Sequence, residues 1–500
     1  MAKKIKKSAF NLSYSNALSF NIGDLVPVYL EDVIPGDHFV IQPDFFVKFA
    51  PMVFPILQRL EAKIKYFFVP NRIMWRKWES FITGGPAGTK VIAPPYGSYA
   101  DLMTLDSDLF DDNTLADYLG FPDFVASTGV STTANTPPIN LIPFYAYQLV
   151  WSEYFRDETL AYDFRNELKY AIDPSGDTED SEYDAQDFAT YLSSYPSATS
   201  VLSPLFTLRK VAWKKDYFTT ASPWAQRGAS VQIPSNLRLE DALHIDSFTS
   251  PPDSPTLDGE EADISGVGWI NTDNDVVASK FAVSNKLTDS EPLGTLNDLY
   301  KASALQRFLQ KSISGSRYIE QILNFFGVRV PDYRLNRPQY LGEVKKVVQI
   351  SEILQTSETT DTSALGTYAG KASVGGVGKP IHFKAYEHGW IIGLMFVRPD
   401  ATYFQGLRKN LSRQDRFDYF WPEFQGIGEQ PILYQELYAQ HGTNAWTDKV
   451  FGYTERFADY KHHANECHGS FRSSMDSWTM ARKFSGAPGL NASILLHNLY

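Results

Sequence analysis

The sequence predicts a mainly β protein in which long loops carry a few short helices. Several segments alternate apolar and polar residues with the two-residue period of a half-buried strand. Aromatic residues make up 14% of the 500 residues, and aromatic side chains favour strands. The helical patterns are short and lie between strand-rich blocks, which disfavours a fold of alternating strands and helices.

The expected strands are 25–34, 38–43, 61–69, 381–386 and 390–397. In 61–69 the even-numbered positions are apolar, whereas Lys63 and Lys65 lie on the opposite face. The last two strands are expected to pair through a turn at 387–389. Helices are expected at 71–82, at 299–309 and at 317–326, the last ending at Gly327 as a C-terminal cap.

Charge is distributed unevenly along the chain. The formal net charge is −12, which argues against a protein that mainly coats nucleic acid. Acidic residues concentrate in 152–191 and 237–298, whereas 301–349 is basic. The run of Ser, Pro and Asp at 250–255 disfavours both helix and strand, so we predict that 237–298 is a surface insertion. Two further loose stretches are 127–140 and 355–379.

No pattern of catalytic or metal-binding residues stands out, so we predict no enzymatic activity, no cofactor and no metal. Cys467 is the single cysteine, which excludes a disulfide within the chain and fits a reducing compartment. The glycine-rich loop at 84–90 lacks the spacing of a phosphate-binding loop, and His462, His463, Cys467 and His468 match no zinc-site spacing. No apolar run is long enough to cross a membrane, and no signal peptide is recognisable.

Two segments have the composition of a nucleic-acid contact. Lys3, Lys4, Lys6 and Lys7 form a basic arm that either faces DNA or is a solubilising terminus. The 301–349 segment mixes bases with aromatic residues, as single-strand binding surfaces do. Phe308 and Phe326 fall on apolar helix faces there, so core positions are the better interpretation for both.

Several short segments of the sequence, taken in order along the chain, resemble segments of a known protein family. They are 21–29 with 32–37, 45–52, 66–72, 78–85, 315–320, 326–328, 337–342, 387–389, 397–400, 403–407, 416–422, 427–430 and 450–453. These segments resemble major capsid proteins of microviruses of the gokushovirus type, which are small single-stranded DNA bacteriophages. The resemblance covers most of the chain outside 97–140, 158–200 and 237–298, and it does not extend to 490–500.

The resemblance implies an eight-stranded antiparallel viral jelly roll with long helix-containing loop insertions. Residues 1–236 would form its first part, with long loops at about 97–140 and 158–200. Residues 298–500 would complete it. The acidic insertion 237–297 would build a protrusion at the three-fold axis and is expected to contact a host receptor. Its candidate contact residues are Asp253, Asp258, Glu260, Glu261, Trp269 and Asp273.

The implied function is assembly of sixty copies into a T=1 icosahedral virion shell around a circular single-stranded DNA genome, in the cytoplasm of a bacterial host. Such a shell needs subunit contacts of several kinds. Arg416, Tyr419, Phe420 and Trp421 are candidate anchors, with an internal core position as the alternative. The family also implies a small basic packaging protein, an internal scaffolding protein and a pilot protein as partners.

Two other functions are alternatives to the capsid interpretation. A carbohydrate-binding or glycan-degrading β-sandwich protein would need a cleft with converging carboxylates. A surface-layer protein would form sheets or tubes and would normally carry an export signal.

Overall fold

The computed structural model describes residues 8–52, 54–85, 88–89, 94–99, 102–103, 106–122, 138–161, 204–226, 228, 269–270, 276–277, 296–312, 317–354, 368–439 and 449–496. The chain divides into two compact units. Unit 1 comprises residues 1–225 and 314–500, and unit 2 comprises 226–313.

Unit 1 is built around an antiparallel four-stranded sheet with the order β1-β13-β4-β9. Its strands are β1 (Val26–Val33), β13 (Gly389–Pro399), β4 (Leu60–Pro70) and β9 (Gln339–Val347). The two central strands are buried on both faces. Strand β13 is an almost continuous apolar run, whereas β4 is apolar in its second half and carries Glu61, Lys63 and Lys65 in its first half.

A second antiparallel layer covers one face of this sheet. Strands β2 (His38–Ile41) and β3 (Asp44–Lys48) follow one another and pair with β12 (Ile381–Lys384) and β11 (Tyr368–Val377). Strand β10 (Gln349–Leu354) pairs with the other side of β11. Even-numbered residues of β4 pack here, and the rings of Phe68 and Phe383 lie 4.7 Å apart.

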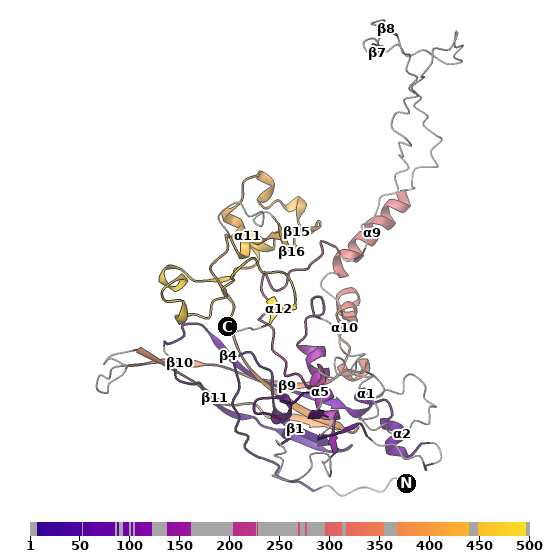
Figure 1. Cartoon of the computed structure of the whole chain (residues 1–500). Coiled ribbons are helices and arrows are strands. Elements are labelled where there is room, and N and C mark those ends of the chain that lie inside the picture. Colours follow the sequence, from indigo (N-terminus) through magenta and orange to yellow (C-terminus); the bar gives the residue numbers. More distant parts are fainter. Residues whose placement is uncertain are drawn as a thin grey trace. The chain divides into compact units, whose positions relative to one another are not determined.

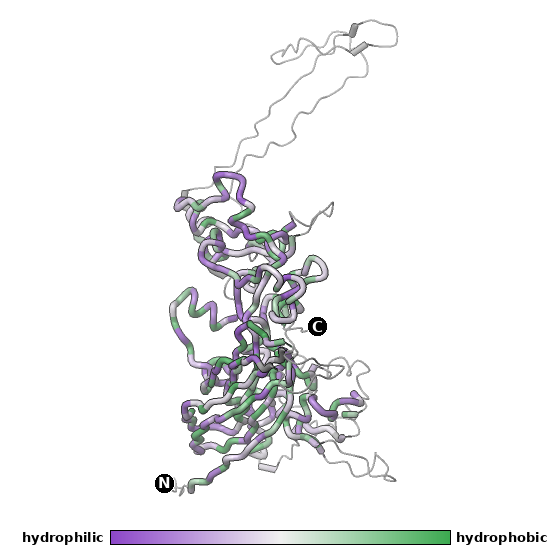
Figure 2. The backbone as a smooth tube through the Cα atoms, turned by 90° about the vertical axis from the view of Figure 1, so that its left-hand side faces the viewer, coloured by the Kyte–Doolittle hydropathy of each residue, from purple (hydrophilic) through white to green (hydrophobic). Residues whose placement is uncertain are grey.

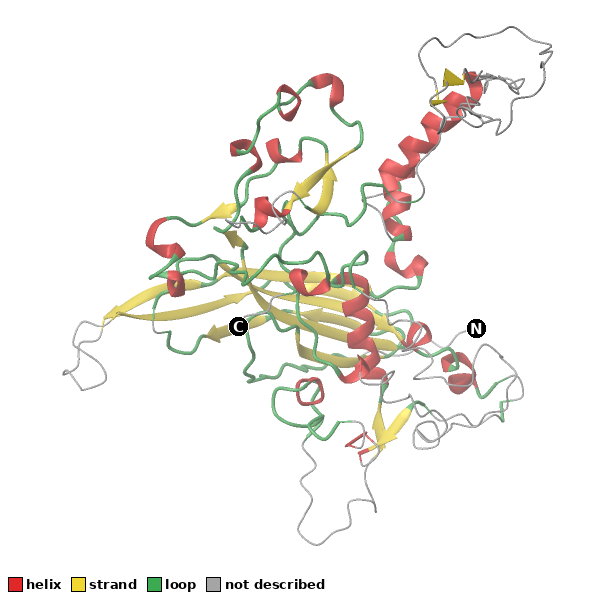
Figure 3. Ribbon diagram, turned by 45° about the horizontal axis from the view of Figure 1, so that its top comes forward, coloured by secondary structure: helices red, strands yellow, loops and turns green. Residues whose placement is uncertain are grey.

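Helix α5 (Ile142–Tyr154) packs against the opposite face of the four-stranded sheet (Figures 1 and 3). Phe67 of β4 and Leu394 of β13 point toward it and are fully buried. Alternation along β4 thus sends odd-numbered residues to the helix and even-numbered residues to the second strand layer. Figure 2 shows hydrophobic and hydrophilic residues alternating along the chain of this unit.

Short elements complete unit 1. Toward the amino-terminal end they are α1 (Asn71–Met74), α2 (Trp78–Thr83), β5 (Tyr96–Ser98), α4 (Leu115–Tyr118) and β6 (Pro138–Asn140). After unit 2 come α10 (Tyr318–Gln321), the π-helix η1 (Ile322–Phe326) and the 3-10 helix η2 (Asp332–Leu335). The carboxyl-terminal part contains β14 (Thr402–Tyr403), η3 (Lys409–Leu411), η4 (Arg416–Asp418), η5 (Pro422–Phe424), β15 (Glu429–Leu433), α11 (Tyr434–Leu437), β16 (Val450–Glu455), η6 (Ala458–Tyr460), β17 (Asn465–Glu466), η7 (Gly469–Arg472), η8 (Asp476–Trp478) and α12 (Ala492–Leu495).

In unit 2, the described elements are β7 (Trp269–Ile270), β8 (Val276–Val277) and the long helix α9 (Leu296–Ser312). No helix in the described parts of the chain is long and apolar enough to span a membrane.

The five expected strands are all present, but one expected pairing is wrong. Strands β12 and β13 do not form a hairpin, because β12 pairs with β2 whereas β13 pairs with β1 and β4. Local sequence could not reveal this choice, because β2 lies more than 300 residues from β12, and β1 and β4 lie more than 300 residues from β13.

Helices are present at all three expected positions, but their bounds or helix types differ from the expectation. The 71–82 helix is two helices, separated at Trp75, which is buried with extended backbone. The 317–326 helix ends as expected at Gly327 with φ 68°, but its second half is a π-helix. Phe308 and Phe326 are not core residues, since they are 53% and 77% exposed.

Candidate assembly surfaces

One candidate surface is the stretch 415–427, which we call the aromatic loop. It follows β14 and η3 and leads into β15. Its large apolar side chains are between 41% and 58% exposed: Phe417, Tyr419, Phe420, Trp421 and Ile427. Exposed aromatic side chains gathered in one short loop make it a candidate interaction surface.

Hydrogen bonds hold the aromatic loop in a defined conformation. The Asp418 carboxylate accepts the backbone N–H groups of Gln414 and Asp415, both at 2.9 Å, and these bonds hold the pKa of Asp418 below its usual value. The indole N–H of Trp421 donates to the Arg416 carbonyl at 2.8 Å. These bonds fix the backbone of the loop and the position of the Trp421 ring.

A largely buried ion pair fixes the base of the aromatic loop. Arg413 pairs with Asp459, and the guanidinium carbon lies 4.2 Å from the centroid of the Tyr460 ring. The Tyr460 hydroxyl accepts the backbone N–H of Phe420 at 3.2 Å. Because Asp459 also accepts the amide of Gln430 at 3.1 Å, the loop is attached to strand β15.

Two carboxylates face each other on the strands that follow the loop. Glu429 of β15 is directly opposite Glu455 of β16 in the antiparallel register. Burial, reinforced by the nearby Glu455, raises the pKa of Glu429 to about 7. Glu455 is partly compensated by Lys461 at 2.9 Å. This pair makes the local charge sensitive to pH near neutrality.

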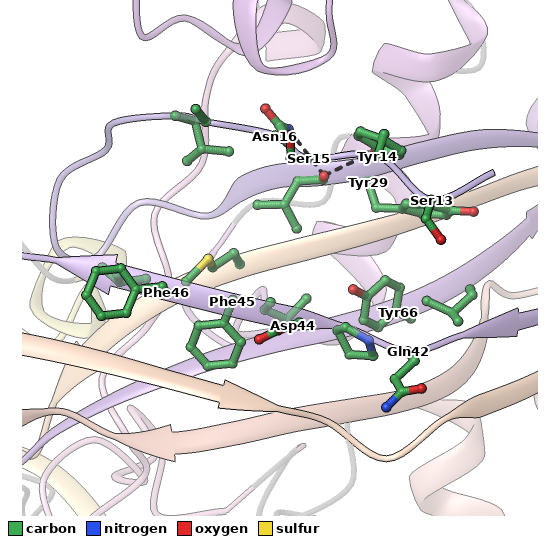
Figure 4. Close-up of a pocket in the computed structure, with 18 of the residues that line it drawn as sticks. Ser13, Tyr14, Ser15, Asn16, Tyr29, Gln42, Asp44, Phe45, Phe46 and Tyr66 are labelled. Atoms are coloured by element: carbon green, nitrogen blue, oxygen red, sulfur yellow. Dashed lines mark hydrogen bonds between the residues drawn. The ribbon is translucent and has the colours of Figure 1, made fainter. Parts of the chain in front are cut away.

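A second candidate surface is a groove of about 2270 Å³, which we call the arm groove. One wall is the extended segment 8–22, and the other is formed by β2 and β3. Figure 4 shows Tyr29 and Tyr66 between these walls. Tyr14 and the amide of Asn16 hold segment 8–22 to the Val28 carbonyl of β1, at 3.5 and 3.3 Å.

A network of ion pairs attaches the segment that follows unit 2 to helix α5. Arg337 lies 3.6 Å from both Glu153 and Asp332, and the Arg337 and Glu153 side chains are each about 10% exposed. Arg317 pairs with Glu158 and donates to the Ser152 carbonyl at 2.9 Å. Burial lowers the pKa of Arg317 below its usual value. These contacts fix where the chain re-enters unit 1.

The structure places the predicted site residues unevenly. The four expected anchors Arg416, Tyr419, Phe420 and Trp421 are all exposed in the aromatic loop, which disfavours the internal-core alternative. The other candidates lie outside the described residues: Lys3, Lys4, Lys6, Lys7, Asp253, Asp258, Glu260, Glu261 and Asp273. Trp269 lies in β7, and its side chain is not described.

Sequence reasoning missed the arm groove and gave no metal site. Among the described residues, no three potential ligands of the His, Cys, Asp and Glu types come together, although 462–468 is fully described. The arm groove had one signal that could have been used. Residues 8–23 contain no charged residue, and apolar side chains alternate at Phe10, Leu12 and Tyr14.

Comparison with known proteins decides the family. The family described as capsid protein (F protein) matches residues 1–499. The chain belongs to this phage capsid family. This capsid protein is 30% identical to capsid protein VP1 of Chlamydia phage 1, over 99% of the chain and 90% of that relative. It is 31% identical to VP1 of Bdellovibrio phage phiMH2K (98% and 88% covered) and 26% identical to VP1 of Spiroplasma virus 4 (98% and 88% covered).

These relatives are all microvirus proteins, so the chain is a microvirus major capsid protein and a component of the virion. The family match spans the regions that composition marks as loops as well as the strands. It does not support the glycan-degrading alternative. A capsid protein must contact other copies of itself.

Proposed function

We propose that sixty copies of this capsid protein close a T=1 shell around a circular single-stranded DNA genome in the bacterial host cytoplasm. The observation that best supports this proposal is the family match over nearly the whole chain, together with the exposed aromatic loop. A closed shell made from one chain requires several distinct contact patches. Aromatic side chains and arginine are the usual energetic anchors of such patches.

The jelly-roll fold is part of this proposal. Its support is the packing of two antiparallel strand layers, β1-β13-β4-β9 on one side and β2, β3, β10, β11 and β12 on the other. Two such layers with long connections between strands are the architecture of capsid jelly rolls. Insertion 237–297 would form the three-fold protrusion that contacts the host receptor, and its acidic composition suits an exposed surface.

The net charge of −12 per copy has a consequence for packaging. A shell of many such chains repels the enclosed polyanion unless bases compensate on the inner side. We propose that Lys3, Lys4, Lys6 and Lys7 supply part of this compensation. A small basic packaging protein would supply the rest, and scaffolding and pilot proteins would act during assembly and delivery.

In the aromatic loop, Arg416, Tyr419, Phe420 and Trp421 would anchor a subunit contact. Replacing Tyr419 and Trp421 together by alanine is expected to abolish shells while leaving the isolated subunit folded, because neither ring is in the core. The matched control is Tyr386→Ala, which removes an 80%-exposed aromatic ring outside the aromatic loop.

The test combines negative-stain electron microscopy with nuclease protection of material made with the phage's own assembly partners. Uniform round shells that protect circular single-stranded DNA support the proposal. Monomers or irregular sheets without protected DNA contradict it. Normal shells from the Tyr419→Ala, Trp421→Ala double variant would contradict only the proposed role of the aromatic loop, and not the capsid function.

A further inference from the structure

Within the part of the chain that the structure describes, strands β2 and β3 leave one backbone edge unpaired. Each is the terminal strand of its sheet, with β12 or β11 as its partner. The carbonyls of Asp37 and Pro43 accept from Ala385 and Gly378 at 2.9 and 2.7 Å, and Phe49 N–H donates to Ala372 at 3.0 Å. Odd-numbered residues therefore face the paired side. By the alternation of an antiparallel strand, the N–H and C=O groups of even-numbered residues 38–48 face away.

This free edge lies beside the arm groove. The groove is lined by residues of both strands and by segment 8–22, which faces them across it. Among the described residues, no backbone hydrogen bond joins 8–22 to 38–48. Phe46 is 74% exposed and Val40 is 57% exposed on this edge. An open edge with exposed apolar side chains is the surface to which an added strand binds.

The same chain carries a segment with strand character and no sheet partner. Segment 8–22 has no charged residue, and its apolar residues Phe10, Leu12 and Tyr14 alternate with polar ones. Phe10 is 81% exposed, and the other two are more than half exposed. Period-two alternation is typical of a strand with one buried face, but in the described chain only Tyr14 of this face is stacked on another ring, that of Tyr29, and Phe10 and Leu12 stay largely exposed.

We propose that segment 8–15 of a second copy of this chain enters the arm groove and adds to the free edge of β2 and β3 as a further strand. This inference rests on the assembly of many copies into one shell. Residues 8–15 of each copy would leave the far wall on assembly and give up the long Tyr14 bond to the Val28 carbonyl (3.5 Å), whereas residues 16–22 would stay in place, held by the Asn16 bond to Val28 at 3.3 Å and by the Tyr118 bond to the Ser19 carbonyl at 2.6 Å.

Charge also favours this occupant. The groove is lined by acidic and basic side chains together, among them Asp37, Asp44, Lys48 and Lys210. Such a surface selects neither a polyanion nor a strongly basic peptide. An uncharged strand would bury Phe46 and Val40 and satisfy the backbone groups of the edge without leaving a charge unpaired.

Cysteine cross-linking between differently substituted copies tests the proposal. The only natural cysteine, Cys467, is buried, so introduced thiols dominate the reaction. One copy carries Phe10→Cys, Leu12→Cys or Tyr14→Cys, and the other carries Val40→Cys or Phe46→Cys with an epitope tag. The two are co-assembled into particles and oxidised, and the products are separated under non-reducing conditions. The control replaces Phe46→Cys by Tyr386→Cys, another strongly exposed position.

A cross-linked dimer of one tagged and one untagged chain, absent with the control, is the expected result. Particles that form but give no mixed dimer overturn the proposal. A disulfide within one chain carrying both substitutions, without mixed dimers, would assign the groove to the copy's own segment and would also overturn it. Electron microscopy of the same samples reports separately whether shells form, so failure of assembly is distinguishable from failure of this contact.

If the substituted copies do not assemble, hydrogen exchange on unmodified particles tests whether a strand adds to the edge of β2 and β3. Backbone amides of Val40, Phe46 and Lys48 are expected to exchange roughly tenfold or more slowly in particles than in dissociated subunits. Equal exchange rates would refute strand addition. Chemical cross-links from Lys48 that lead to a different phage protein, and not to the amino-terminal segment of a second copy, would refute the proposed occupant.

Discussion

Replacing Gly406 by alanine is expected to destabilise the carboxyl-terminal part of unit 1 strongly. A Cβ atom at this position would lie 1.9 Å from the backbone oxygen of Glu436 and 2.5 Å from its carbonyl carbon. Real Cβ atoms do not approach other heavy atoms within 3.0 Å, so the two backbone segments must separate by about 1 Å. Neither side of this contact is a flexible side chain that could move aside.

Two hydrogen bonds resist that separation. Leu407 N–H donates to the Gln435 carbonyl, and Ala439 N–H donates to the Gln405 carbonyl, both at 2.8 Å. Losing both costs about 1 kcal/mol each, and overpacking adds about 1 to 3 kcal/mol. We therefore expect Gly406→Ala to lower the free energy of unfolding by about 3 to 5 kcal/mol.

The assay is urea unfolding of the isolated subunit, with Gly486→Ala as the matched control. No heavy atom lies within 4 Å of a Cβ at Gly486, so that variant is expected to match the parent protein to within about 1 kcal/mol. Equal unfolding midpoints for the two variants would refute the argument, because both add the same methyl group and differ only in the space around it.

Three further outcomes are expected. Burial raises the pKa of Glu429 to about 7 in the folded protein, so ionisation of this carboxyl lowers the free energy of unfolding. Glu429→Gln cannot ionise, so its free energy of unfolding is expected to exceed that of the parent protein. This difference is absent below about pH 4.5 and is complete above about pH 7. Solvent screens this half-exposed group, so unfolding curves should differ by about 1 to 2 kcal/mol at pH 8; a difference that does not change with pH would contradict the assignment. Phe67→Ala removes a fully buried ring and should cost about 3 to 5 kcal/mol in denaturant unfolding, whereas a loss below 1 kcal/mol would mean that the α5 layer is not packed as described. Asn491→Ala removes the cap of α12 and should cost about 1 kcal/mol, with Asn491→Asp as the variant that keeps the cap.

Much of the fold could be predicted because its strands carry their own signal. Alternation in 61–69 identified β4, and the expected strand 390–397 forms most of β13. Gly327 marked a helix end because a left-handed backbone conformation favours glycine. The division of 71–82 into two helices could not be predicted, because Trp75 leaves the helical conformation to pack in the core cluster around α5.

The candidate site was predicted in part for the same kind of reason. The composition of 415–422 indicated an anchor surface, but only the structure decided between an exposed and a buried position. Phe326 shows the opposite outcome, because its position on an apolar helix face suggested a core residue and the ring is exposed. Periodicity reports which residues share a face, and it cannot report whether another part of the chain covers that face.

The sequence by itself determined the β-rich class, the places of the main strands and the resemblance to microvirus capsid proteins. These properties depend on residue type and short spacing, which are local along the chain. The tertiary structure decided that β12 pairs with β2 and not with β13, that Gly406 lies against Glu436, and that one edge of β2 and β3 has no strand partner among the described residues. Each of these depends on segments that are distant in sequence, and their meeting is set by the competition of all apolar faces for the same core.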